Sequence, residues 1–133
     1  MAIVNNNEYG EISINNSAIE KIVINNLLKM KYAFFPTNKR GKLIMTKGLR
    51  TKITDYVGAV EVSEYQGRLF IKIYYIIKFG ESITLESNKL FDLIEKDLTN
   101  IGLKLPEQII AKITGVMSKN IAKRELEVVR RNE

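Results

Sequence analysis

The sequence predicts an α+β fold, in which mostly antiparallel strands form a sheet with helices on one face. The expected order is β-α-β-β-α-β, followed by a short C-terminal helix. Two observations favour this class: apolar residues recur at helical spacing in two separate stretches, and they alternate with a period of two in a long stretch between them. Hairpin strands covered by helices on one side are typical of α+β proteins.

The 133 residues predict a single domain, with a core over about residues 9–117 and a polar tail over 118–133. The chain shows no internal repeat and no linker rich in Gly or Ser, and its only prolines are Pro36 and Pro106. Hydrophobic residues make up 45% and charged residues 27% of the chain, which is ordinary for a globular protein.

The first elements are a strand at residues 11–14 and a helix at about residues 18–30. Ser17 and Glu20 have the spacing of a capping box, in which each side chain satisfies a free amide at the start of a helix. After a connection, the alternation predicts a hairpin of two strands, at residues 60–62 and 69–79. One face of the longer strand is entirely apolar and the other is mixed, as expected when helices cover only one side of the sheet.

A second helix is predicted at about residues 85–101, where Gly102 follows in a position suited to a left-handed helix end. A last strand is predicted at residues 109–116. The spacing of Ile121, Glu125, Leu126 and Val129 then predicts the terminal helix. The mixed strand face, with its Phe70, Tyr74 and Ile76, is expected either to bind a partner or a second copy of the chain, or to be covered by this terminal helix.

Composition argues against most enzyme chemistry. The chain has no His, Cys or Trp, so it has no imidazole base, thiol nucleophile or zinc thiolate site. Asp55, Asp92 and Asp97 are the carboxylates that could be considered for an acid–base pair. Asp92 and Asp97 fit the solvent face of the second helix, whereas such a pair needs two carboxyl groups in unlike environments. We therefore expect no catalytic residues, no metal site and no cofactor.

One segment holds all of the positive charge excess. Residues 29–52 contain eight Lys and Arg and no Asp or Glu, whereas the rest of the chain has 13 basic and 15 acidic residues. The candidate binding residues in it are Lys39, Arg40, Lys42, Lys47, Arg50, Lys52, Phe34 and Phe35.

Three interpretations of this segment remain open. It is a solvated loop anchored by its Phe34-Phe35 pair; or it binds an acidic protein or an anionic membrane surface; or it binds nucleic acid, with Tyr32, Phe34 and Phe35 stacking on bases. The absence of a GXXG loop and of an RNP-type aromatic motif counts against the last of these.

Several short motifs resemble the alkaline shock protein family of Gram-positive-type bacteria. They are YGEISI (residues 9–14), GAVEV (58–62), the strand that ends in Phe79-Gly80, and the closing strand that ends in Gly115-Val116. The chain departs from the family pattern in its basic connection and in the Ser82-Ile83-Thr84 start of its second helix, where proline is frequent.

The resemblance implies a small non-enzymatic protein linked to cell-envelope stress or lipid metabolism, and for some members to membrane association. We accordingly expect an interaction or scaffold protein that acts through protein partners, self-association or an anionic surface. A nucleic-acid-binding module is the alternative. The chain start lacks a signal-peptide pattern, and no apolar run reaches the length needed to span a bilayer, so we expect a cytoplasmic protein that is peripheral to the membrane if it contacts one.

Overall fold

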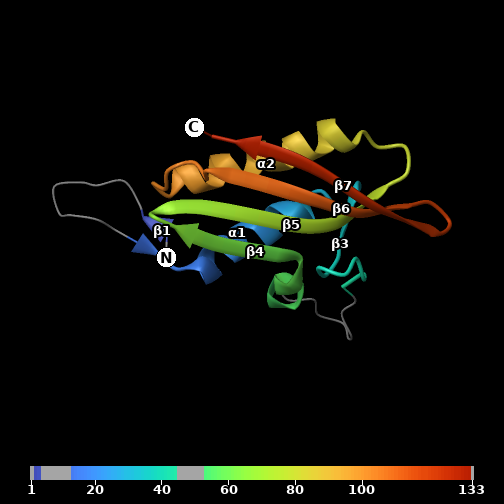
Figure 1. The fold of residues 1–133 in the computed structure, drawn as a ribbon, viewed down its shortest axis with the longest axis horizontal. Helices are drawn as coiled ribbons and strands as arrows, with labels where there is room; N and C mark the ends of the chain where they lie inside the picture. Colours follow the sequence, from blue (N-terminus) through green and yellow to red (C-terminus); the bar gives the residue numbers. More distant parts are fainter. Residues whose placement is uncertain (1, 4–12, 45–52, 133) are drawn as a thin grey trace.

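The computed structural model describes residues 2–3, 13–44 and 53–132 of the chain. In this part, two α-helices cover one face of a five-stranded mixed sheet, so the predicted α+β class is confirmed. Figure 1 looks onto the other face of the sheet, with both helices behind it. A separate pair of short strands, β1 (Ala2–Ile3) and β2 (Ser13–Ile14), precedes the first helix.

The sheet is built around the central strand β5 (Arg68–Lys78). On one side, β4 (Val60–Tyr65) pairs with the first half of β5 and β3 (Phe34–Pro36) pairs with its end, both antiparallel. On the other side, β6 (Gln108–Met117) runs parallel to β5. The predicted hairpin is therefore confirmed, and the parallel pair makes the sheet mixed.

Both helices begin at a side-chain cap. Helix α1 (Asn16–Lys29) starts after Asn15, whose side chain accepts a hydrogen bond of 3.0 Å from the Ala18 amide. The expected capping box at Ser17 and Glu20 is therefore wrong, because Asn15 already caps the helix two residues earlier.

Helix α2 (Ile83–Asn100) is capped by Ser82 and ends before Gly102, whose φ of +88° is the left-handed conformation expected there. It connects β5 to β6, as a parallel pair requires. A 3₁₀ helix, η1 (Ile53–Ala59), leads into β4.

The predicted C-terminal helix is wrong. The chain forms β7 (Ile121–Arg131), an edge strand antiparallel to β6. The spacing of Ile121, Leu126 and Val129 fits a helix by coincidence, whereas in the structure Val128 packs against the core and Val129 lies on the opposite face. Backbone pairing with β6 decides the conformation of a segment whose own side chains are mostly exposed.

The core lies between the sheet and the two helices. On β5 it contains the face that the alternation predicts, up to Ile77, while Phe79 lies beyond the strand and is 71% exposed. Phe34 stacks on Tyr75 at 4.1 Å between ring centroids. Arg130 of β7 reaches the helix side of the sheet, where it donates to Asp92 and Glu95 of α2. Among the described residues, no helix packs on the opposite face of the sheet.

Candidate functional site

The face of the sheet opposite α1 and α2, here called the open face, carries the candidate binding surface. Cross-strand partners share a face, so the strand register gives its side chains in rows. The first row runs from β4 to β7 through Ser63, Phe70, Gln108 and Arg131. The second row runs through Glu61, Lys72, Ile110 and Val129.

A tight turn at residues 37–44, here called the basic turn, projects from the end of β3 beside this face. The side chain of Asn38 organises it, because its Oδ1 accepts hydrogen bonds from the amides of Arg40 (2.9 Å) and Lys42 (3.0 Å). The Asn38 amide in turn donates to the Lys42 carbonyl at 2.9 Å. An Asx-type turn of this kind holds its backbone fixed while the Arg40 and Lys42 side chains remain exposed.

The basic turn is fastened to a β-bulge in β6. The register of β6 shifts between Ile113 and Gly115, which places the bulge at Thr114. The Thr114 hydroxyl lies 3.2 Å from the Thr37 hydroxyl and donates to the Tyr75 carbonyl at 3.3 Å. The bulge therefore fixes the position of the turn over the sheet.

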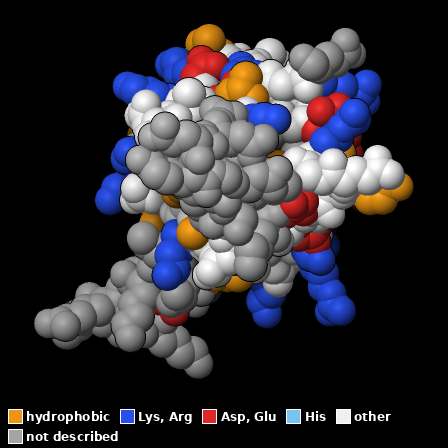
Figure 2. All heavy atoms as spheres, turned by 90° about the vertical axis from the view of Figure 1, so that its left-hand side faces the viewer, with side chains coloured by type: hydrophobic (Ala, Val, Ile, Leu, Met, Phe, Trp, Pro, Cys, Tyr) orange, Lys and Arg blue, Asp and Glu red, His pale blue; other side chains and the backbone are white. Residues whose placement is uncertain are grey.

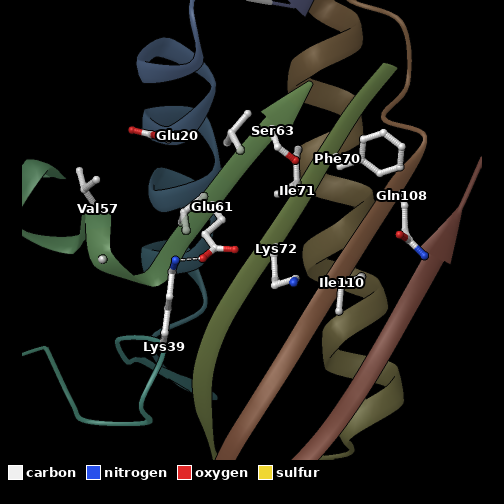
Figure 3. Close-up of a pocket in the computed structure, with 13 residues that line it drawn as sticks. Glu20, Lys39, Val57, Glu61, Ser63, Phe70, Ile71, Lys72, Gln108 and Ile110 are labelled. Atoms are coloured by element: carbon white, nitrogen blue, oxygen red, sulfur yellow. Dashed lines mark ion pairs between the residues drawn. The ribbon is translucent and has the colours of Figure 1, made fainter. Parts of the chain in front are cut away.

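Lys39 extends from the turn to the sheet and forms an ion pair with Glu61 of β4 (Figure 3). The hydrogen bond and the charge of Glu61 raise the pKa of Lys39 above its ordinary value. Beside them, burial and the charge of Glu61 raise the pKa of Tyr74. Lys39 therefore stays protonated in its contact with Glu61.

Three adjoining hollows cover the open face and the basic turn, with volumes of about 620, 510 and 820 Å³. Seven cations and four glutamates line them. The cations are Lys39, Arg40, Lys42, Lys72, Lys112, Lys123 and Arg124. Two of the glutamates are held in ion pairs, Glu61 with Lys39 and Glu127 with Lys112. Within the described residues, Lys72 and Lys123 have no carboxylate partner, so the surface is net positive.

Positive side chains are arranged differently elsewhere. On the end of the molecule that Figure 2 shows, several Lys and Arg side chains have Asp or Glu side chains beside them. On the helix side, Arg130 is held between Asp92 and Glu95. The cations of the open face differ because they come from the turn and from three strands that meet there.

The structure brings three of the sequence candidates to this surface, namely Lys39, Arg40 and Lys42. Phe34 is 1% exposed in the core, so its ring is not available to a partner. Phe35 is half-buried and lies opposite Ile76 on the open face.

The other candidates lie elsewhere. Lys47, Arg50 and Lys52 fall outside the described residues. Tyr32 is about half exposed but faces α2, where its hydroxyl donates to Glu86 at 2.8 Å, so the structure does not bring it to the basic turn.

Sequence reasoning missed Lys72, Lys112, Lys123 and Arg124. The available signal was the alternation of β5 and β6, which sets Lys72 and Lys112 opposite the apolar core positions. Lys123 and Arg124 could not be found, because the segment that contains them was expected to be a helix.

Two of the carboxylates considered above, Asp92 and Asp97, are bound by neighbouring side chains. Asp92 binds Arg130, and Asp97 accepts a hydrogen bond of 2.8 Å from Asn26. Among the described residues, no group of three or more Asp and Glu is placed to hold a metal ion. Neither described helix has the length and apolar character needed to cross a bilayer.

Comparison with protein-family models, curated proteins and solved structures finds no match for this chain.

Proposed function

We propose that this chain is a non-enzymatic binding protein that holds an anionic partner against the open face of its sheet. The observation that carries the proposal is the gathering of seven cations from the basic turn, β5, β6 and β7 around three adjoining hollows, against four glutamates. Clustered cations attract polyanions and speed their association.

The rigid attachment of the basic turn supports the same conclusion. Hydrogen bonds link Thr37 of the turn to Thr114 and Thr114 to the Tyr75 carbonyl, so the turn is attached to the sheet and is not only a solvated loop. These bonds hold Arg40 and Lys42 beside Lys123 and Arg124 without further loss of backbone freedom on binding.

The motif resemblance to alkaline shock proteins favours a scaffold role in envelope homeostasis or lipid metabolism. The cations of the open face suit an acidic protein, an anionic membrane surface or nucleic acid as the anionic partner.

The test measures binding of two polyanions that share charge but little else: poly-L-glutamate and a phosphodiester oligomer without bases. The variant combines Arg40→Gln, Lys42→Gln and Arg124→Gln. The matched control combines Lys21→Gln, Lys96→Gln and Lys104→Gln, which remove the same charge from exposed positions outside the three hollows.

We expect the wild type and the control to bind both polyanions, with affinity that falls steeply from about 50 to about 200 mM salt. The open-face variant should bind much more weakly and with a flatter salt dependence. If the wild type binds neither polyanion at low salt, or if both variants lose affinity equally, the proposal is wrong.

A further inference from the structure

The first row of the open face combines one aromatic ring with neutral hydrogen-bonding groups and a cation. Phe70 lies on the central strand, Ser63 and Gln108 lie beside it on β4 and β6, and Arg131 follows on β7. Among the described residues, the side chains of Ser63, Phe70 and Gln108 take part in no hydrogen bond or ring contact.

We propose that the partner of the open face is single-stranded RNA, with one base stacked on the ring of Phe70. This inference rests on the proposed function and names the partner for the same surface. Phe70, Ser63, Gln108 and Lys72 all line one hollow, and Figure 3 shows them on neighbouring strands of the sheet. An aromatic ring on a sheet face is a common platform for an unstacked base.

The groups around Phe70 match the remaining parts of a nucleotide. The Gln108 amide has both donors and an acceptor, as the edge of a base requires. The Ser63 hydroxyl and the Gln108 amide can also bond a ribose 2′-hydroxyl, which is both donor and acceptor. Lys72, two residues along β5, and Arg131, two strands away, supply cations for the phosphates of the bound strand.

The alternation of the strands confirms that Arg131 belongs to this row. Its neighbour Arg130 faces α2, where it bonds Asp92 and Glu95, so Arg131 points to the opposite side of the sheet. The row crosses three interstrand spacings of about 4.8 Å, or roughly 14 Å, which leaves room for a short single-stranded segment.

An acidic protein and a duplex fit the row less well. An acidic protein surface brings carboxylates to the cations but no base to stack on Phe70. A duplex keeps its bases paired, so that only its backbone would reach the cations. The combination of ring, amide and cation favours a strand with unpaired bases.

The test compares Phe70→Leu with Phe35→Leu, the same substitution on the same face of the sheet. Phe35 lies opposite Ile76, three register positions along the face from Phe70, and does not line the hollow that Phe70 lines. Leucine keeps an apolar side chain and removes the aromatic ring, and thermal unfolding of both variants checks that they fold. The probes are a labelled single-stranded RNA octamer, the same sequence as DNA, its RNA duplex and the abasic oligomer used above.

We expect the wild type to bind the RNA octamer about tenfold more tightly than the abasic oligomer, and Phe70→Leu to remove this difference. Phe35→Leu should retain the difference between the RNA octamer and the abasic oligomer. Arg131→Gln should flatten the salt dependence of RNA binding. The DNA strand and the RNA duplex should bind more weakly than the RNA strand. The RNA inference is overturned if the wild type binds the RNA octamer and the abasic oligomer equally, or if Phe70→Leu keeps the wild-type difference between them. Polyanion binding is intact in both cases. Equal affinity for DNA overturns the choice of RNA. Failure to bind any polyanion overturns the proposed function as well.

Discussion

Gly41 of the basic turn and Thr114 of the β6 bulge are in close contact, such that a β carbon on Gly41 would lie only 3.1 Å from the Thr114 Cβ. Gly41 also has a φ of +83°, which L side chains rarely adopt. The position of the basic turn over the sheet therefore depends on a residue without a side chain.

Gly41→Ala should displace the basic turn and weaken polyanion binding severalfold while the domain stays folded. The reason is that the new methyl group pushes the turn away from Thr114 and moves Lys39, Arg40 and Lys42 together. Binding of the abasic oligomer measures the effect. Gly80→Ala is the matched control, because Gly80 has a φ of +94° but no atom within 4 Å of the position its β carbon would take. Equal binding by the two variants would show that the contact does not position the turn.

Gly115→Ala should destabilise the domain by about 1–3 kcal/mol through overpacking. A β carbon there would lie 3.1 Å from the Ala122 carbonyl and 3.3 Å from Ile76. Gly58→Ala should change stability little, since the nearest atom to its β carbon would be 3.9 Å away. Urea unfolding of the two variants separates overpacking at Gly115 from a general effect of glycine replacement. A Gly115→Ala protein as stable as the wild type would contradict the close packing around Gly115.

Arg130→Ala should cost about 2 kcal/mol of unfolding free energy. The Arg130 guanidinium donates to Asp92 at 2.6 Å, to Glu95 at 2.8 Å and to Asn88 at 2.8 Å, and lies 5.4 Å from the centre of the Phe91 ring. Lysine at this position keeps the charge but not the forked geometry, so it should recover only part of the loss.

The neighbouring Arg131→Ala provides the control for Arg130, because Arg131 is exposed on the opposite face and should change stability by less than about 0.5 kcal/mol. Guanidinium unfolding is unsuitable because the salt screens the ion pairs, so urea is the denaturant of choice. Similar losses for both arginines would argue against a specific link between β7 and α2.

Alkaline pH should destabilise the protein through Tyr75. Burial raises the pKa of Tyr75, although its hydrogen bond with Ser87 opposes the shift. Below pH 10 the tyrosine is protonated in both states and contributes no pH dependence; above pH 10 the unfolded chain releases the proton first, so the unfolding free energy falls as pH rises.

Urea unfolding at pH 8, 10 and 11 measures this loss, which reaches at most about 1.4 kcal/mol per pH unit for one group. Tyr75→Phe should be less stable than the wild type at pH 8, because Ser87 loses its hydrogen-bond partner. Between pH 10 and 11, however, its unfolding free energy should fall by less than that of the wild type. Parallel pH profiles for the two proteins would mean that other groups control the alkaline response.

The elements that could be predicted from the sequence are those whose side-chain pattern matches their burial. Strand β5 alternates between core and open face, and α2 buries Leu90, Ile94 and Leu98 in one stripe, so periodicity alone locates both. Strand β7 has no such pattern, since its conformation comes from pairing with β6, a contact between segments that the sequence does not show to be neighbours.

The candidate site could be predicted only where it is local. Lys39, Arg40 and Lys42 are consecutive or nearly so, and their charge is visible in the sequence. Lys72 and Lys123 join them only because the strands bring distant positions to one face. Phe34 could not be separated from Phe35, because which of two adjacent aromatic residues faces the core depends on the register of β3 against β5.

The outer side of β7 has a consequence for solubility. An edge strand of this length offers backbone amides and carbonyls with which another sheet could pair, and such edges promote aggregation. Charged side chains interrupt β7 at Lys123, Arg124, Glu125 and Glu127, and most of the strand's side chains are exposed. Pairing between two such edges would crowd these charged side chains together, so they disfavour growth of the folded chain into fibrils.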